Sequence, residues 1–246
     1  MTLPSFRGVY LPSTLGNYSQ RVVKDPPIVA AVHVTGNKTT ASMKVGIESG
    51  QGTYQEWLYA ARNPLSKGGP SAHRYVARDG NFIDMIRPPL VAWSNGDLLQ
   101  PDTRWPAIAT MVAQRAKGIS PNQLCYREYE LTGYPTAALR PTDAQLRSTA
   151  LQIAKDSIAL NKPIVLGKTV ILHRMVNSVS RPNCPFPAAE WRPMADKLIA
   201  YAKEYRAELT PATGWTGMVE LEVAGELVDV LYDEGSVDLD EARDLP

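Results

Sequence analysis

A histidine and a cysteine, His173 and Cys184, lie close together in the segment ILHRMVNSVSRPNCPF, residues 171–186. The chain has 3 histidines and 2 cysteines, so this segment uses two scarce residue types. Together with His33 they could hold zinc through two imidazoles and one thiolate, leaving a fourth position for water, as in catalytic zinc sites. From the residues alone the alternative stays open: two satisfied polar histidines and a small core cysteine.

Both histidines stand at the ends of predicted strands. The valine-rich run PPIVAAVHVTGN, residues 26–37, predicts a buried strand that closes in a Gly-Asn turn. KTVILH, residues 168–173, predicts a second strand that ends on His173. Because ligands gather where the strands of an α/β sheet end, these positions suit a binding site.

Further strands and helices interleave along the chain. Residues 72–86 contain two extended runs around an Asp-Gly pair, which predicts a hairpin. CYREYEL, residues 125–131, predicts a strand with Glu128 and Glu130 on one face. Helices are predicted over residues 53–64, 141–161 and 190–209; the second opens on a capping box of Thr142 and Gln145. The order predicts an α/β fold in which helices flank a central mixed β-sheet.

Charge is distributed unevenly. Residues 207–246 hold eleven acidic side chains and one basic one, whereas residues 1–206 hold 25 Lys and Arg against 14 Asp and Glu. A basic body with an acidic tail favours an anionic partner such as a cell-wall polymer; the alternative is a solvated basic surface. No apolar run approaches the roughly 20 residues of a membrane-spanning helix. Two cysteines exclude a disulfide scaffold.

Four segments, in order, resemble the zinc-dependent N-acetylmuramoyl-L-alanine amidases of the type 2 amidase family, which includes peptidoglycan recognition proteins and many phage endolysins. IVAAVHVTGN resembles the strand of the first ligand, and ILHRMVNSVSRPNCPFPAAEW the strand and loop of the other two. Between them, GPSAHRYVARDGNFIDMIRPPLVAW resembles the family's hairpin, and REYELTGYPTAALRPTDAQLRSTALQIAKD its glutamate strand and the following helix. The resemblance covers roughly residues 26–206.

The resemblance implies a role for each candidate residue. His33, His173 and Cys184 would bind Zn²⁺, and Glu130 falls on the family glutamate that acts on the zinc-bound water. Arg181 is a candidate for stabilising the oxyanion. Thr35 is a candidate for orienting the site, with a hydrogen bond within the turn as the alternative. Three aromatic residues are candidates for walls that contact sugar or peptide, with core packing as the alternative: Trp57, Trp93 and Tyr134. An exposed strand residue is the alternative for Glu130, and His73 matches a family histidine that is not a ligand.

The chain also departs from the family pattern. Pro182 occupies the position of a lysine that can stabilise the tetrahedral intermediate, which leaves Arg181 as the nearest cation. Ala72 stands where some members have tyrosine, and Ser94 replaces the histidine of an Ala-Trp-His motif. These changes put the accessory groups in doubt but leave the ligand set complete. A disulfide between Cys125 and Cys184 is the rival to a metal site.

The expected function is hydrolysis of the amide between N-acetylmuramic acid and L-alanine in bacterial peptidoglycan. An amidase domain over residues 1–209, with its core at 26–206, would precede an acidic extension over 210–246 that contains a β-hairpin at 218–232. The N-terminus shows no signal peptide, so we expect a phage-encoded lysin made in the host cytoplasm. It would act on the wall after release or as a virion component, with no nucleic-acid partner. The alternatives are a non-catalytic peptidoglycan-binding module and a virion structural protein that contacts tail proteins.

Overall fold

The computed structural model describes residues 3–6, 8–10, 18–34, 71–96, 98–133 and 140–210. Six strands of this part form a central sheet in the order β1-β5-β4-β7-β3-β8. Their bounds are Gly8–Tyr10 (β1), Phe82–Asp84 (β5), Arg74–Val76 (β4), Cys125–Leu131 (β7), Ile28–Val34 (β3) and Val170–Leu172 (β8). Two further strands, β2 (Tyr18–Gln20) and β6 (Leu90–Ala92), pair with each other.

The central sheet is mixed. β3 runs parallel to both β7 and β8, and β4 runs parallel to β7. β4 and β5 form the expected antiparallel hairpin, and Gly80 in its turn has a φ of 91°, a conformation that glycine adopts readily. The predicted fold class, a mixed central sheet with flanking helices, is therefore confirmed.

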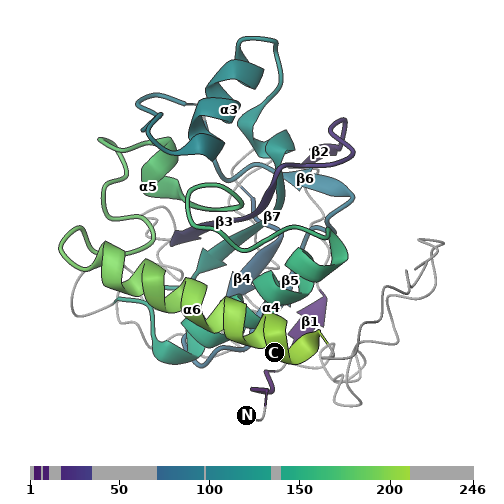
Figure 1. The fold of residues 1–246 in the computed structure, drawn as a ribbon, viewed down its shortest axis with the longest axis vertical. Helices are drawn as coiled ribbons and strands as arrows, with labels where there is room; N and C mark the ends of the chain where they lie inside the picture. Colours follow the sequence, from purple (N-terminus) through teal and green to yellow (C-terminus); the bar gives the residue numbers. More distant parts are fainter. Residues whose placement is uncertain are drawn as a thin grey trace, which may run out of the picture.

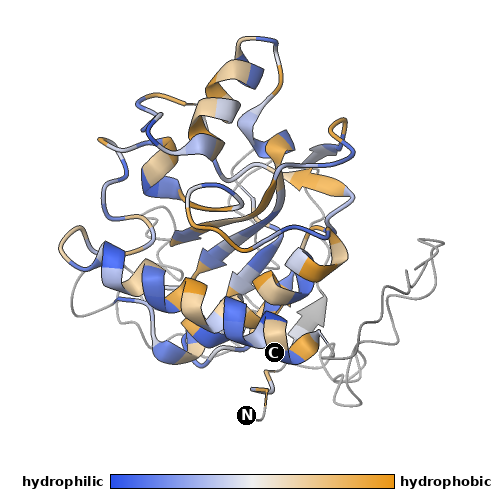
Figure 2. Ribbon diagram, in the orientation of Figure 1, coloured by the Kyte–Doolittle hydropathy of each residue, from blue (hydrophilic) through white to orange (hydrophobic). Residues whose placement is uncertain are grey.

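Helices cover both faces of the sheet. The helices α4 (Asp143–Ala159) and α6 (Trp191–Leu209) pack together on one side, whereas α3 (Pro106–Arg115) and the single turn α5 (His173–Val176) lie on the other (Figure 1). In Figure 2, α6 carries both hydrophilic and hydrophobic residues, as expected of a helix with one buried face. A short 3₁₀ helix, Pro121–Leu124, leads into β7.

The capping box predicted for α4 is present. Thr142 Oγ1 accepts from the backbone N–H of Gln145, and Gln145 Oε1 accepts from the backbone N–H of Thr142. The Gln145 amide also donates to the carbonyls of Val76 and Thr132, at the ends of β4 and β7. One side chain thus begins the helix and fixes its start against the sheet.

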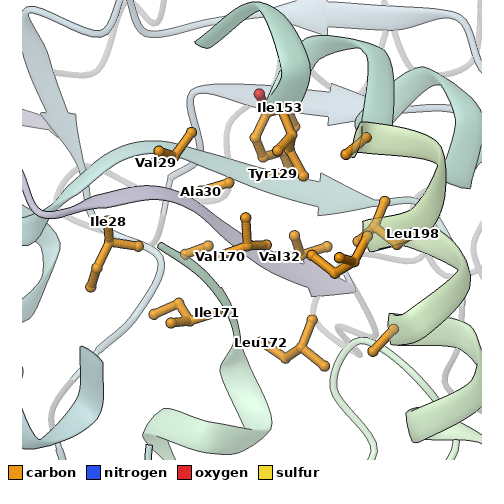
Figure 3. Packing of buried hydrophobic residues seen from close by; sticks show 14 of the residues in the cluster. Ile28, Val29, Ala30, Val32, Tyr129, Ile153, Val170, Ile171, Leu172 and Leu198 are labelled. Carbon is orange, nitrogen blue, oxygen red and sulfur yellow. The ribbon is translucent and has the colours of Figure 1, made fainter. Parts of the chain in front are cut away.

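The apolar core packs the central strands against α4 and α6 and also includes residues of α3 and α5. All seven residues of β3 are buried, so the strand is covered on both faces. Val32 on β3, Ile153 on α4 and Leu198 on α6 belong to one apolar cluster with the strand residues around them (Figure 3). At roughly 25 cal/mol per Å² of buried apolar surface, this cluster is the main favourable contribution to folding.

Alternation along the strands separates this core from a polar face. Arg127 and Tyr129 of β7 point to α4, because both bond Asp156 on that helix. Glu128 and Glu130 therefore face the opposite way, as the sequence predicted. The register aligns Glu130 with His33 of β3, so these two side chains share that opposite face.

A buried ionic network supports the α4 side. Arg74 on β4 makes a bidentate pair with Asp84 on β5, with distances of 2.6 and 2.5 Å. Arg127 makes a second bidentate pair with Asp156, at 2.9 and 3.2 Å, and the Tyr129 hydroxyl donates to the same carboxylate at 2.7 Å. A contact of 3.5 Å between Arg127 and Asp84 connects the two pairs, so the network links β4, β5 and β7 to α4 and satisfies charges that would otherwise be costly to bury.

The structure differs from the sequence-based elements in a few places. His173 is the first residue of α5 rather than the last residue of β8. The short strands β1, β2 and β6 and the helix α3 were not predicted. The predicted helix over 53–64 and the extension over 210–246 with its hairpin lie outside the described residues, apart from Thr210. Within the described ranges, no helix combines the length and apolarity required to cross a membrane.

Candidate metal centre

Three predicted ligands meet at the ends of neighbouring strands. His33 stands near the end of β3, His173 directly follows β8, and Cys184 lies in the loop between α5 and α6. One ligand atom from each residue lies within 4.8 Å of the other two. The imidazole rings are 4.6 Å apart between centroids and tilted by 58°.

The spacing fits a small tetrahedral cation. His173 Nδ1 and Cys184 Sγ are 3.6 Å apart. Two tetrahedral zinc bonds, of about 2.05 Å to nitrogen and about 2.3 Å to sulfur, would hold their ligand atoms roughly 3.6 Å apart. The Nδ1 atom of His33 is buried without a hydrogen-bond partner among the described residues, so it is free to serve as the third ligand.

The Nε2 atoms of His33 and His173, which are not the candidate ligand atoms, contact polar neighbours. His33 Nε2 lies 3.1 Å from Ser94 Oγ. His173 Nε2 lies 3.3 Å from Asn177 Nδ2, and the ring also bonds the backbone of Asn95. Such contacts orient an imidazole and determine which nitrogen faces a metal.

Burial shapes the electrostatics of the ligands. Desolvation lowers the pKa of His33 well below its usual value and that of His173 to about 4, so both rings are neutral near pH 7. Desolvation raises the pKa of the Cys184 thiol, whose sulfur accepts from the Val34 N–H at 3.3 Å. Neutral imidazoles are ready to bind a cation, and a cation would favour the thiolate over the thiol.

Glu130 is the carboxyl next to this cluster. Its register neighbours are His33 on one side and Tyr75 of β4 on the other. The residue is half-buried, and its Oε2 atom has no hydrogen-bond partner among the described residues. Desolvation raises the pKa of Glu130 to about 8, opposed by the positive charge of Arg181. A carboxyl with a pKa near neutrality is suited to both accept and donate a proton.

Arg181 lies on the α5–α6 loop three residues before Cys184. It is exposed, and its backbone carbonyl accepts from the Cys184 N–H at 3.1 Å. Its positive charge contributes to lowering the pKa of both candidate histidine ligands and of Glu130. The guanidinium of Arg181 therefore lies close enough to the cluster to influence the charge state of each of these residues.

The other sequence candidates lie around or away from the cluster. Trp93 is half-buried, and its Nε1 donates to Ser19 Oγ at 3.4 Å. His73 is buried and structural, because Nδ1 accepts from the Glu128 N–H and Nε2 bonds the Leu90 carbonyl. Both cysteines are free, so the rival Cys125–Cys184 disulfide is not formed. Thr35, Trp57 and Tyr134 lie outside the described residues.

Two polar contributors were not predicted from the sequence. Asn95 and Asn177 contact His173 but come from different loops. Asn177 lies four residues after His173, a helical spacing that would have suggested contact if the turn α5 had been expected. Asn95 carried no such local signal.

Comparison with known proteins finds short sequence matches to curated proteins and longer structural matches to solved structures. No family model matches the chain. Two curated relatives, both called Protein PhoH2, match short segments: that of Mycolicibacterium smegmatis is 56% identical over 45 residues, and that of Thermobispora bispora 49% identical over 52 residues. These segments are 18% and 21% of this chain but only 10% and 12% of the relatives, so the chain matches about a tenth of their length.

Solved structures match over a far larger part of the chain. The Staphylococcus aureus hydrolase AmiA, in complex with its ligand, aligns with a TM-score of 0.50 at 15% identity, covering 85% of this chain and 87% of that one. The N-acetylmuramoyl-L-alanine amidase LysC from Clostridium intestinale aligns with a TM-score of 0.44 at 13% identity, covering 79% and 98%. At this level of identity, the likeness to AmiA shows a shared fold.

Proposed function

We propose that this chain is a zinc-dependent hydrolase that cleaves the amide between N-acetylmuramic acid and L-alanine in bacterial peptidoglycan. The observation that carries the proposal is the meeting of His33, His173 and Cys184 beside the carboxyl of Glu130. The fold shared with a hydrolase supports it. The sequence resemblance to type 2 amidases supplies the substrate.

The donor set fits zinc better than a hard cation. Two imidazole nitrogens and one thiolate suit zinc, whereas magnesium and calcium prefer oxygen ligands. The three residues would supply three zinc ligands and would leave a fourth coordination position for water or substrate, as in catalytic sites. When bound, zinc supplies a Lewis acid that polarises a carbonyl and lowers the pKa of a bound water to about 7.

Glu130 is proposed as the general base. Its carboxylate would take a proton from the attacking water and later return it to the leaving amine of L-alanine. Its half-buried position raises its pKa toward neutrality, which suits a group that must perform both transfers. Arg181, exposed near the cluster, would stabilise the negative charge that develops on the scissile carbonyl oxygen.

The biological setting is also part of the proposal. We place the protein as a phage-encoded lysin that acts on the host cell wall during lysis, either after release or from the virion, and that would be antimicrobial when added from outside. Its basic body would favour anionic wall polymers. Because the ligand set and the candidate base are complete, a cutting enzyme is favoured over a non-catalytic peptidoglycan-binding module.

Metal content and product chemistry test this proposal together. The full-length protein should bind about one zinc per chain and release new L-alanine amino termini from purified peptidoglycan. Cys184→Ser should weaken zinc binding and activity together. Cys125→Ser is the matched control, because Cys125 is an equally buried free thiol outside the ligand set. A His173→Ala variant that keeps full zinc content would refute the metal site, and digestion without new amino termini would refute the amidase activity.

A further inference from the structure

A second carboxyl, that of Glu128, is buried beneath the candidate centre and is not used by the proposed reaction. Glu128 and Asn95 are both 0% exposed. Glu128 Oε1 accepts from Asn95 Nδ2 at 2.5 Å. The other oxygen of each group, Glu128 Oε2 and Asn95 Oδ1, has no hydrogen-bond partner among the described residues.

The two oxygens without partners, Glu128 Oε2 and Asn95 Oδ1, belong to side chains that already share a hydrogen bond, so one missing proton could explain both. An ionised carboxylate and an amide oxygen can only accept, so neither can satisfy the other. A protonated carboxyl has one O–H donor. One proton on Glu128 Oε2 would therefore provide for both atoms at once, since it can bond Asn95 Oδ1 while Asn95 Nδ2 bonds Oε1.

We infer that Glu128 is a neutral carboxylic acid that pairs with the Asn95 amide through two hydrogen bonds, and that this pair positions the segment Ser94–Asn95, which orients both candidate histidine ligands. The conclusion that Glu128 is protonated depends only on the contacts of Glu128 and does not require a bound metal. The positioning of ligands rests on the proposed function, because it matters only if His33 and His173 bind a metal.

The groups around Glu128 agree with a neutral carboxyl. His73 Nδ1 lies 3.8 Å from Glu128 Oε2, but both ring nitrogens are already used by backbone groups, and desolvation lowers the His73 pKa to about 3. Arg21 donates to four backbone carbonyls rather than to the carboxyl. Desolvation raises the pKa of Glu128 well above its usual value. It outweighs hydrogen bonding from the side chain and backbone of Ser94 and the charge of Arg21, which favour the ionised form, and the charge of Glu130 adds to the rise. The remaining titratable neighbour, the thiol of Cys125, is uncharged because desolvation raises its pKa.

The segment held by Glu128 reaches both imidazoles. Ser94 Oγ lies 3.1 Å from His33 Nε2, and the backbone of Asn95 bonds His173. The Asn95 N–H donates to Asn122 Oδ1 at 2.9 Å, so the segment is fixed from a second side. Glu128 is thus a positioning residue that acts on the ligands through Asn95 and Ser94.

Unfolding measured against pH tests the protonation. Glutamate in the unfolded chain titrates near pH 4.3, whereas a buried neutral Glu128 keeps its proton at higher pH. The folded state then binds more protons, so wild-type stability falls with rising pH in comparison with Glu128→Gln. The ratio of their unfolding equilibrium constants, wild type over variant, should rise about tenfold per pH unit above about pH 4.5.

Unfolding curves of Glu128→Gln and the wild type that run parallel over this pH range would overturn the inference. If that variant does not fold reversibly, infrared spectra of the wild type at neutral pH, compared with folded Glu128→Gln at low denaturant, should show one protonated-carboxyl band that the variant lacks. Absence of that difference band would equally overturn it.

Zinc affinity tests the positioning. In a chelator competition, Glu128→Gln should bind zinc within about threefold of the wild type, because glutamine can form the same two bonds with Asn95. Glu128→Ala should bind about 10–100-fold more weakly, as is typical when a group that orients ligands is removed. Wild-type affinity in folded Glu128→Ala would refute the positioning. A wild-type protein that binds no zinc would instead refute the proposed function and leave the pH result standing.

Discussion

Replacing Glu130 by glutamine should lower the rate of amide hydrolysis by about 10²–10⁴-fold while zinc stays bound. The substitution keeps the size of the side chain but removes its ability to accept a proton from water. Because none of the candidate ligand atoms belongs to Glu130, metal content should not change. The loss corresponds to about 3–5 kcal/mol of transition-state stabilisation.

The structure explains why Glu130 rather than Glu128 should have this effect. Glu130 is in register with His33, whereas Glu128 is in register with Ala31. Alternate residues of a strand lie roughly 6–7 Å apart, and a general base must come within about 3 Å of the water or act through one further water. Glu128 is also engaged by Asn95. Glu128→Gln should therefore cost less than about tenfold in rate.

The assay compares the two variants with the wild type on purified peptidoglycan at several pH values, with zinc content measured on the same samples. Release of L-alanine amino termini gives the rate. A Glu130→Gln protein with near wild-type turnover would refute the assignment of the base and make Glu128 the first alternative. Loss of zinc from Glu130→Gln would refute the prediction that Glu130 acts as a base without contributing to metal binding.

Three further predictions concern stability and charge. Asp156→Ala should lower the free energy of unfolding in urea by about 3–5 kcal/mol, because it removes the bidentate partner of buried Arg127, which keeps only a 3.5 Å contact to Asp84. Asp196→Ala, which removes an exposed pair, should change the free energy of unfolding by less than about 1 kcal/mol. In the zinc-free protein, the free energy of unfolding should fall as pH drops below about 6.5, because histidine in the unfolded chain binds a proton there while buried His73 does not until about pH 3. His73→Gln should reduce the pH dependence of the free energy of unfolding by about 1.4 kcal/mol per pH unit. An unchanged pH dependence would contradict the assignment of His73 as a buried neutral residue. A chain truncated after Leu209 should keep its fold and bind anionic cell walls more tightly than the full-length chain at low salt, because it lacks the acidic extension. The difference in affinity should shrink as the salt concentration rises. Failure of the truncated chain to fold would place residues 210–246 in the core.

Local patterns in the sequence were sufficient for the main elements. The alternating run over residues 125–131 became β7 with those bounds, and the capping box of Thr142 and Gln145 begins α4 as predicted. Both depend on neighbours within a few residues, which is why periodicity and capping chemistry identify them. The hairpin around Gly80 was equally local.

The candidate ligands could also be named from the sequence, because scarce residue types followed predicted strands and the ordered segments resembled a family. The structure brings His33, His173 and Cys184 within reach of one another, and their role as zinc ligands stays a prediction. Short strands such as β6 escaped prediction, since three residues carry too little periodicity to stand out.

Only the tertiary structure decided which carboxyl lies beside the cluster and what surrounds it. Alternation places Glu128 and Glu130 on the same face, but the register of β7 against β3 aligns Glu130 with His33 and leaves Glu128 buried against Asn95. That register depends on pairings across about a hundred residues of chain, and no local pattern encodes it. For the same reason, the contacts from Ser94 and Asn95 to the histidines could not be derived from the sequence: these residues meet because the strands pack, not because of any spacing along the chain.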